Sequence, residues 1–191
     1  MDQSILYFLN GMVGKWPFVD GLAKFLINGS LVIIPLLVLL VFLFGVFLKK
    51  ERYRTAAVNA ACVVLLCLLI GFIIERFTFE VRPMFSLDDM VILMSHTNDS
   101  SFPSDHMLLC FGAAFGLWRL SKGLSITTMV FGLLVGLAKI FAAQHYPSDI
   151  LFTILVALAI YLLYAILLRK LVTKVYQAID RHIFPKPKES V

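Results

Sequence analysis

A cation, an imidazole and a carboxylate lie within eleven residues of one another in the second half of this chain. They are Lys139, His145 and Asp149, and they stand where two long apolar segments meet. Ionisable groups at or near membrane depth are energetically costly, so such a cluster indicates a functional site. Pro147 is typical of the first turn of a helix, which puts Asp149 one turn into that helix. A carboxylate that accepts from one nitrogen of His145 leaves the other nitrogen free to act as a base or nucleophile.

The same spacing has a simpler interpretation, because a histidine and an aspartate at a helix start are often only a cap and a polar rim. Other polar residues favour the functional interpretation. Ser104, Asp105 and His106 follow Pro103 and predict a helix start capped by Ser104 or Asp105. The free N–H groups and the dipole of a helix start attract anions. Arg82 adds a guanidinium fork suited to phosphate oxygens.

Two histidines, His106 and His145, are therefore expected beside an anion site that also receives Lys139. His145 alone has an acidic residue one turn away, which is Asp149. This asymmetry favours His145 as a nucleophile oriented by Asp149, and His106 as the acid that protonates the leaving group.

The composition indicates an integral membrane protein. Of the 191 residues, 60% are hydrophobic and only 15% are charged. A water-soluble domain cannot bury that much apolar surface, whereas several bilayer spans of roughly 20 residues each accommodate it. We expect one all-α domain over residues 1–191, a helical bundle surrounded by membrane lipids. The net charge of +5 does not indicate a nucleic-acid partner, because the basic residues lie in short loops and in the C-terminal tail.

Hydropathy predicts five spans, at residues 29–48, 56–79, 104–120, 124–143 and 147–168. Residues 2–26 are apolar but interrupted around Trp16, and we expect them to form an interfacial or re-entrant helical hairpin. A sixth span is the alternative for that segment. Residues 169–191 are expected to form a basic, frayed tail.

Lys and Arg are concentrated in three segments, residues 49–54, 119–122 and 169–191. The positive-inside rule makes these segments cytoplasmic, so the loops at 80–103 and 143–147 face outward. The polar residues from Arg82 to Asp149 then gather at the outer ends of the spans, whereas chance helix caps would be scattered over both faces. His96 in the outer loop is expected to be a solvated residue.

Three motifs of this chain, taken in order, resemble those of the type 2 phosphatidic acid phosphatase superfamily. They are Arg82-Pro83, Pro103-Ser-Asp-His106 and Lys139-x5-His145-x3-Asp149, and the resemblance covers residues 75–155. The short chain and the form of the first two motifs are most similar to the bacitracin-resistance type undecaprenyl-diphosphate phosphatases.

The resemblance implies hydrolysis of a polyprenyl or phospholipid diphosphate through a phosphohistidine on His145, oriented by Asp149, with His106 as the acid. It also implies that the phosphoryl oxygens are bound by Arg82, Ser104, Lys139 and the amides near Asp105. No metal and no cofactor are implied. The expected substrate is undecaprenyl diphosphate, which yields the monophosphate carrier of cell-wall precursors in a bacterial plasma membrane.

Three positions depart from the family pattern. Glu75 stands where Lys is usual, Lys139 where Arg is usual, and Asp105 where Gly is usual. Arg76 is an alternative cation beside Glu75, and Asp105 could cap its helix or pair with Arg82 or Lys139. Two other functions therefore stay open: a phosphatase acting on phosphatidylglycerophosphate or phosphatidic acid, and a catalytically silent protein that binds lipid phosphates.

Overall fold

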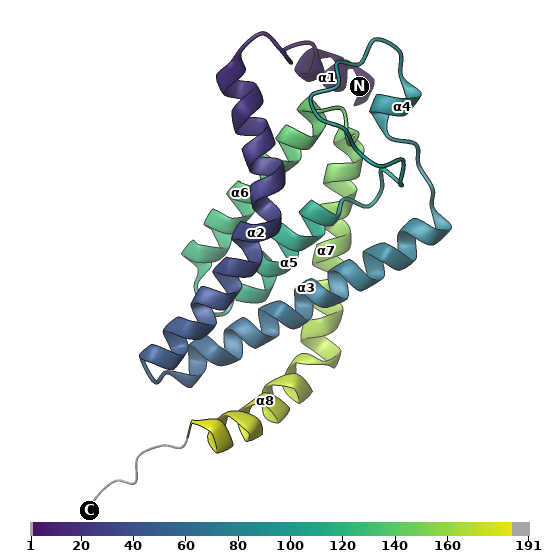
Figure 1. The fold of residues 1–191 in the computed structure, drawn as a ribbon. Helices are drawn as coiled ribbons and strands as arrows, with labels where there is room; N and C mark the ends of the chain where they lie inside the picture. The colour runs from purple at the N-terminus through teal and green to yellow at the C-terminus, as the bar shows by residue number, and fades with distance from the viewer. Residues whose placement is uncertain (1, 185–191) are drawn as a thin grey trace, which may run out of the picture.

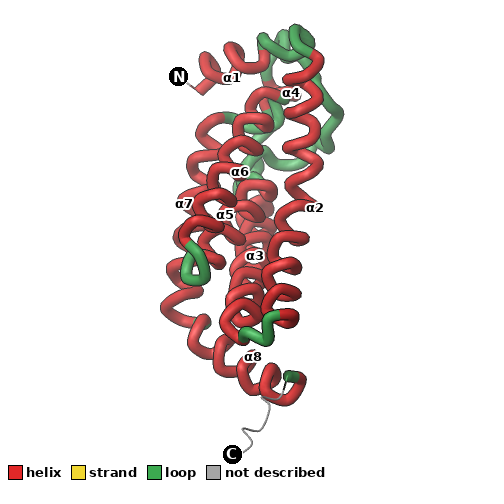
Figure 2. The backbone as a smooth tube through the Cα atoms, turned by 90° about the vertical axis from the view of Figure 1, so that its left-hand side faces the viewer, coloured by secondary structure: helices red, strands yellow, loops and turns green. Residues whose placement is uncertain are grey.

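The structure is a computed structural model that describes residues 2–184. Its described part consists of helices joined by turns and loops, and its only β-pairing is an isolated antiparallel bridge between Val81 and Ser100. The helices pack together into an elongated bundle (Figures 1 and 2). Their bounds are α1 (Asp2–Asn10), α2 (Pro17–Phe47), α3 (Glu51–Phe77), α4 (Pro83–Ser86), α5 (Asp105–Leu117), α6 (Lys122–Phe141), α7 (Pro147–Leu167) and α8 (Arg169–Ile183). The predicted all-α bundle is confirmed.

Four of these helices, α2, α3, α6 and α7, are long and apolar enough to cross a membrane. The third predicted span is shorter than expected, because α5 has 13 residues. At 1.5 Å per residue it extends about 20 Å, which is less than the roughly 30 Å of a hydrocarbon core. Helix α5 instead packs against α2, α3, α6 and α7, and most of its side chains are buried. Its apolar sequence therefore reflects burial among the other helices.

The N-terminal segment differs from the predicted hairpin. Helix α1 ends at Asn10, the chain turns through Gly14 at φ 80°, and α2 then continues without a break to Phe47. Residues 17–26 are thus the first part of a 31-residue helix. Ala23 of this part and Ile27, just after it, pack with Phe141 at the end of α6, and this contact explains why the segment joins the bundle.

The C-terminal segment is helical through Ile183, where a frayed tail was expected. Two nitrogens of Arg54 donate to the carboxylate of Asp180 at 2.7 and 2.6 Å, and both side chains are buried. A third donates to the carbonyl of Gly45 at 2.8 Å. This two-pronged ion pair fixes α8 against the turn between α2 and α3. The predicted fraying at residues 185–191 falls outside the described residues.

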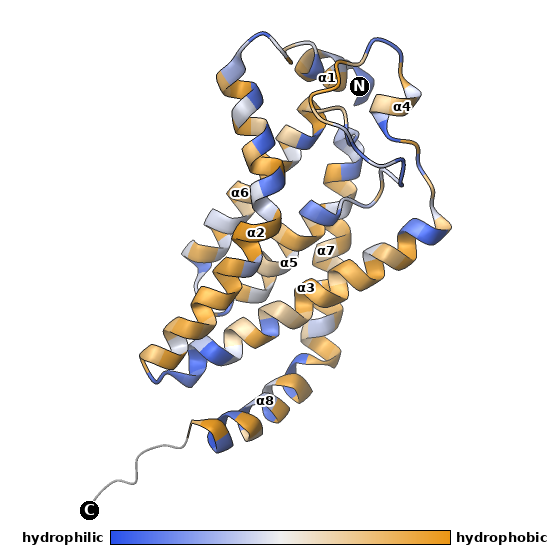
Figure 3. Ribbon diagram, in the orientation of Figure 1, coloured by the Kyte–Doolittle hydropathy of each residue, from blue (hydrophilic) through white to orange (hydrophobic). Residues whose placement is uncertain are grey.

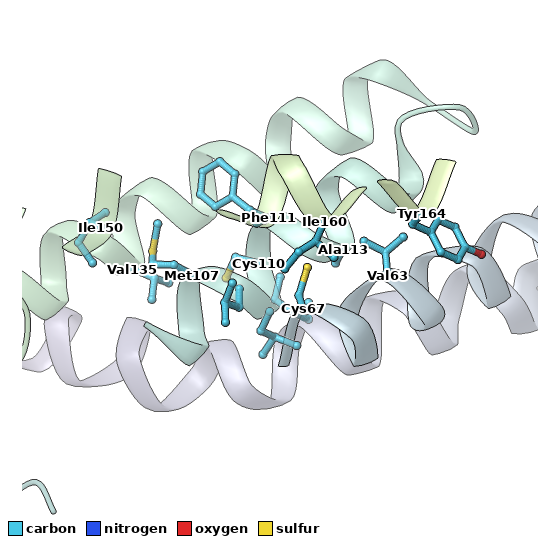
Figure 4. Packing of buried hydrophobic residues seen from close by; sticks show 14 of the residues in the cluster. Val63, Cys67, Met107, Cys110, Phe111, Ala113, Val135, Ile150, Ile160 and Tyr164 are labelled. Carbon is cyan, nitrogen blue, oxygen red and sulfur yellow. The ribbon is translucent and has the colours of Figure 1, made fainter. Parts of the chain in front are cut away.

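A continuous apolar core runs along the bundle, from Ile150 at one end to Val63 and Tyr164 at the other (Figure 4). Helices α3 and α5 approach closely at Gly116, where an added Cβ would lie 2.5 Å from the Cα of Ala60. This packing brings the ends of α3 and α6 and the starts of α5 and α7 together at one end of the bundle.

Candidate active site

A polar cavity of about 150 Å³ lies at that end of the bundle. It collects side chains from α3, α5, α6, the turn before α7 and the outer loop, which are far apart in the sequence. Five of the seven predicted site residues line it. The lining consists of Glu75, Arg82, His96, Asp99, Ser100, Pro103, Asp105, His106, Lys139 and His145. The three sequence motifs therefore meet in one place.

His145 lies in the turn between α6 and α7 and is 2% exposed. Its Nδ1 is 2.6 Å from the backbone oxygen of Ser101. A carbonyl oxygen only accepts, so this contact assigns the ring proton to Nδ1. The lone pair then resides on Nε2, which lies 3.1 Å from Nη1 of Arg82 and accepts a hydrogen bond from it. The unprotonated nitrogen of this imidazole thus faces a guanidinium group.

Asp149 does not bond directly to His145 as the sequence spacing suggested. Its Oδ2 is 3.8 Å from Nδ1, which is too long for a hydrogen bond. The same oxygen accepts from the Ser101 hydroxyl at 2.5 Å and from the backbone N–H of Tyr146 at 2.8 Å. Ser101 comes from a segment 44 residues earlier and stands between the two groups. Asp149 is thus linked to the imidazole of His145 through Ser101.

Arg82 is 5% exposed and uses its guanidinium to connect three segments. Nε donates to Oδ1 of Asp99 at 2.7 Å, and Nη1 donates to the carbonyl of Gln144 at 2.9 Å as well as to His145. The backbone of Arg82 is extended, as expected before a proline, and Pro83 begins α4. The guanidinium is therefore fixed in place before any substrate arrives.

Asp99 and His96 also line the site, although no sequence pattern predicts this placement. Burial acts to raise the pKa of Asp99, but hydrogen bonds from Arg82 and Thr97 and the charge of Arg82 hold that pKa below its usual range. The side chain of His96 is only 20% exposed, which corrects the expectation of a solvated residue. Burial lowers the pKa of His96, and the nearby positive charges of Arg82 and Lys139 lower it further.

Lys139 occupies the last turn of α6 and is 1% exposed. Its Nζ donates to Oε1 of Gln144 at 2.8 Å. Gln144 therefore contacts both cations of the cavity, Lys139 through its side chain and Arg82 through its backbone oxygen. The position of Gln144 next to His145 is the one feature of the sequence that could have suggested these contacts.

The start of α5 is arranged differently from the prediction. Ser104 occupies the N-cap position, yet its side chain makes no capping bond and its hydroxyl is buried with no partner among residues 2–184. Its backbone N–H donates to the hydroxyl of Thr153 at 3.0 Å. Ser104 does not line the cavity, so this arrangement provides no hydroxyl contact from it to a phosphate. The side chains of Asp105 and His106 do line the cavity.

Glu75 faces the cavity at the position where the family usually has lysine. Its Oε1 is 3.4 Å from the backbone N–H of Ser100. Arg76 points elsewhere, with its guanidinium 4.6 Å from the ring of Phe72, so it does not supply the missing cation. Asp105 forms no ion pair with Arg82 or with Lys139 in the described part of the chain. Two carboxylates thus line the cavity in addition to the paired Asp99.

Residues 56–172 match the PAP2 superfamily. The chain belongs to this superfamily. It is 28% identical over 193 residues to undecaprenyl-diphosphatase BcrC of Bacillus subtilis, which covers 98% of this chain and 97% of that relative. It is also 25% identical to the putative undecaprenyl-diphosphatase YbjG of Escherichia coli, over 79% of this chain and 74% of the relative.

The crystal structure of Aquifex aeolicus LpxE shares the PAP2 fold of this chain. Its TM-score is 0.67 at 19% identity, and the match covers 85% of this chain and 93% of that one. All the predicted site residues fall within the region matched by the superfamily. Together, the family and these relatives support the function of a membrane lipid phosphatase.

Proposed function

We propose that this chain hydrolyses undecaprenyl diphosphate to undecaprenyl phosphate and inorganic phosphate. The similarity to an undecaprenyl-diphosphatase over nearly the whole chain supports the substrate. The observation that carries the chemistry is His145, whose Nε2 is free of hydrogen and lies beside Arg82 in a polar cavity. The active site faces the outer side of a bacterial plasma membrane, where the reaction regenerates the lipid carrier for cell-wall precursors and provides resistance to bacitracin.

In the first step, Nε2 of His145 attacks the terminal phosphorus of the diphosphate. An N–P bond forms while the bond from phosphorus to the bridging oxygen breaks, and His106 gives its proton to the leaving lipid phosphate. Nη1 of Arg82 occupies the lone pair of Nε2 before substrate binds. It must therefore transfer its hydrogen bond to a phosphoryl oxygen, so that binding of the phosphate uncovers the nucleophile.

In the second step, His106 takes a proton from water, and the resulting hydroxide attacks the phosphorus. The N–P bond breaks, inorganic phosphate leaves, and Nε2 of His145 recovers its lone pair. Arg82 and Lys139 stabilise the charge that develops on the phosphoryl oxygens in both steps. Both cations are buried and hydrogen-bonded before reaction, so they need little rearrangement.

Asp149→Asn is expected to lower kcat by about 10- to 100-fold. This is less than the roughly 10⁴-fold loss seen when a carboxylate bonded directly to a catalytic histidine is changed to the amide. The smaller effect is expected because the carbonyl of Ser101, rather than Asp149, holds the proton on Nδ1. Ser101→Ala, which removes the hydroxyl and keeps the carbonyl, should fall in the same range. Initial rates at saturating substrate measure both, and a 10⁴-fold loss for Asp149→Asn would indicate direct contact with His145 during turnover.

The proposed substrate is tested by phosphate release from purified protein in detergent with EDTA present. Undecaprenyl diphosphate, phosphatidylglycerophosphate and phosphatidic acid are compared at equal concentration, and the diphosphate is expected to give the highest kcat/KM. A higher value for either phospholipid would favour that substrate instead. Binding of all three without turnover would favour the silent function, and Glu75→Lys combined with Lys139→Arg should then create activity.

A further inference from the structure

A second polar cavity, of about 440 Å³, lies at the opposite end of the bundle from the candidate active site. Its lining residues come from the start of α3, the ends of α5 and α7 and the start of α8. The candidate active site is bounded instead by the end of α3 and the start of α5. The two cavities share no lining residue.

The second cavity carries an excess of positive charge. Arg52, Arg119 and Arg169 line it, and Glu51 is its one acidic lining residue. Arg52 donates to the backbone oxygen of Leu120 at 2.9 Å. Within residues 2–184, none of the three arginines forms an ion pair with a carboxylate. Guanidinium groups present several donors whose planar geometry matches phosphate oxygens, so the cavity suits a phosphate-bearing anion.

The neutral wall of this cavity is held by hydrogen bonds between three helices. The amide nitrogen of Asn59 donates to the carbonyl of Thr55 at 2.8 Å and to the hydroxyl of Thr173 at 3.3 Å. The hydroxyl of Tyr164 donates to the amide oxygen of Asn59 at 2.7 Å. Thr55 also belongs to the lining, and its hydroxyl is buried with no partner among the described residues. Buried polar atoms are usually satisfied, and a ligand that reaches this hydroxyl would supply its missing partner.

The surroundings of the cavity point to a lipid as the source of the phosphate. Helix α8 has a row of exposed apolar side chains at a spacing of four residues, formed by Leu171, Val175 and Ile179. Hydrophobic and hydrophilic residues alternate along α8 in Figure 3. Such an amphipathic helix lies in the headgroup region, with its apolar face toward the acyl chains. In that orientation Arg169, at the start of α8, would lie at the depth of lipid phosphates.

We propose that this second cavity binds the phosphate group of an anionic membrane lipid. Basic pockets between membrane helices bind the headgroups of anionic lipids. Free inorganic phosphate has the same chemistry and is the other possible source. The proposal is independent of the proposed catalytic function, because it uses none of the residues of the candidate active site.

The test measures phosphatidylglycerol binding to the full chain in detergent by native mass spectrometry. All proteins carry Arg82→Gln and Lys139→Gln, so that the candidate active site does not retain phosphate. Adding Arg119→Gln and Arg169→Gln is expected to weaken phosphatidylglycerol binding by roughly tenfold or more. The matched control adds Arg76→Gln and Arg181→Gln, two exposed arginines outside the cavity, and should bind as before. Phosphatidylcholine, whose headgroup has no net charge, should bind weakly to every variant.

Inorganic phosphate separates the two sources. If millimolar phosphate displaces phosphatidylglycerol and raises the melting temperature only when Arg119 and Arg169 are present, the site takes free phosphate. If phosphate has no such effect, the lipid is the ligand. Equal phosphatidylglycerol binding in the two quadruple variants would overturn the proposal. If the arginine variant does not fold, Thr55→Val replaces it, because valine keeps the shape of the side chain. This variant is expected to weaken phosphatidylglycerol binding severalfold. Unchanged binding by Thr55→Val would also overturn the proposal.

In an otherwise wild-type background, Arg119→Gln with Arg169→Gln is expected to leave phosphate release from a lipid diphosphate unchanged in detergent. This second measurement separates the two proposals. If the protein does not bind the lipid but turns over normally, only the proposal for the second cavity is contradicted. If the unmodified protein shows no turnover, only the proposed catalytic function is contradicted.

Discussion

His145→Ala is expected to lower kcat for phosphate release by at least about 10³-fold. Alanine removes Nε2, the atom proposed to form the bond to phosphorus, and no other side chain that lines the cavity has a nitrogen held in the same way. His106 lines the same cavity but is assigned to proton transfer, so it does not replace the lost nucleophile. Initial rates with undecaprenyl diphosphate in detergent measure the effect.

His96→Ala is the matched control for that experiment. His96 also lines the cavity, but it is not assigned to either chemical step. Its loss is expected to change kcat by less than about tenfold, since it makes no direct contribution to the transition state. A loss of less than about tenfold for His145→Ala, with a melting temperature close to that of the wild type, would contradict the role of His145 as nucleophile.

Arg82→Ala is expected to lower kcat/KM by about 10²- to 10³-fold, the usual effect of removing a preorganised donor to a developing oxyanion. The substitution also leaves Asp99 unpaired beside an incoming phosphate, and the resulting repulsion weakens substrate binding. Arg82→Lys should restore only part of the loss. A single ammonium group cannot reproduce the planar set of contacts to Asp99, Gln144 and His145.

Arg76→Ala controls for the loss of a positive charge near the same end of α3. Its guanidinium lies over the ring of Phe72 and outside the cavity. Activity close to that of the wild type is expected. If Arg82→Ala were no more damaging than Arg76→Ala, the guanidinium of Arg82 would have no part in binding the phosphoryl group.

The meeting of Arg82, His106, Lys139 and His145 in one cavity could be predicted from the sequence. Each residue adjoins the end of an apolar segment, and the charge distribution places these ends on the same side of a membrane. The length of α5 could not be predicted in the same way. Hydropathy records that its residues are apolar, but a helix buried among other helices and a helix exposed to lipid can have the same composition.

The contacts that orient His145 depend on backbone groups, which leave no trace in residue types. The carbonyl of Ser101 accepts from Nδ1, and the carbonyl of Gln144 accepts from Arg82. Every residue has such a carbonyl, so only the tertiary structure shows which one is used. The four-residue spacing between His145 and Asp149 suggested a direct bond, and the insertion of Ser101 between them is a long-range event.

The positions of the loop residues and the helix at the N-terminal segment could not be predicted for other reasons. Asp99 and His96 lie in a loop without periodicity, so nothing in the sequence indicated that they face inward. Pro17 interrupts the apolar pattern and suggested the turn of an interfacial or re-entrant hairpin over residues 2–26. In the structure it occupies the first turn of α2, a position where proline favours the helix rather than ending it.

The central claim is that Nε2 of His145 forms a covalent bond to phosphorus during turnover. Undecaprenyl diphosphate carrying a radiolabel in its terminal phosphate is mixed with the protein, and the reaction is stopped in alkali, where a phosphorus–nitrogen bond on histidine survives. Peptide mapping by mass spectrometry then locates the modified residue. A labelled phosphohistidine is expected at His145 in the wild type, and none is expected in His145→Ala. Label on a different residue, or equal label in both proteins, would contradict the proposed covalent bond to His145.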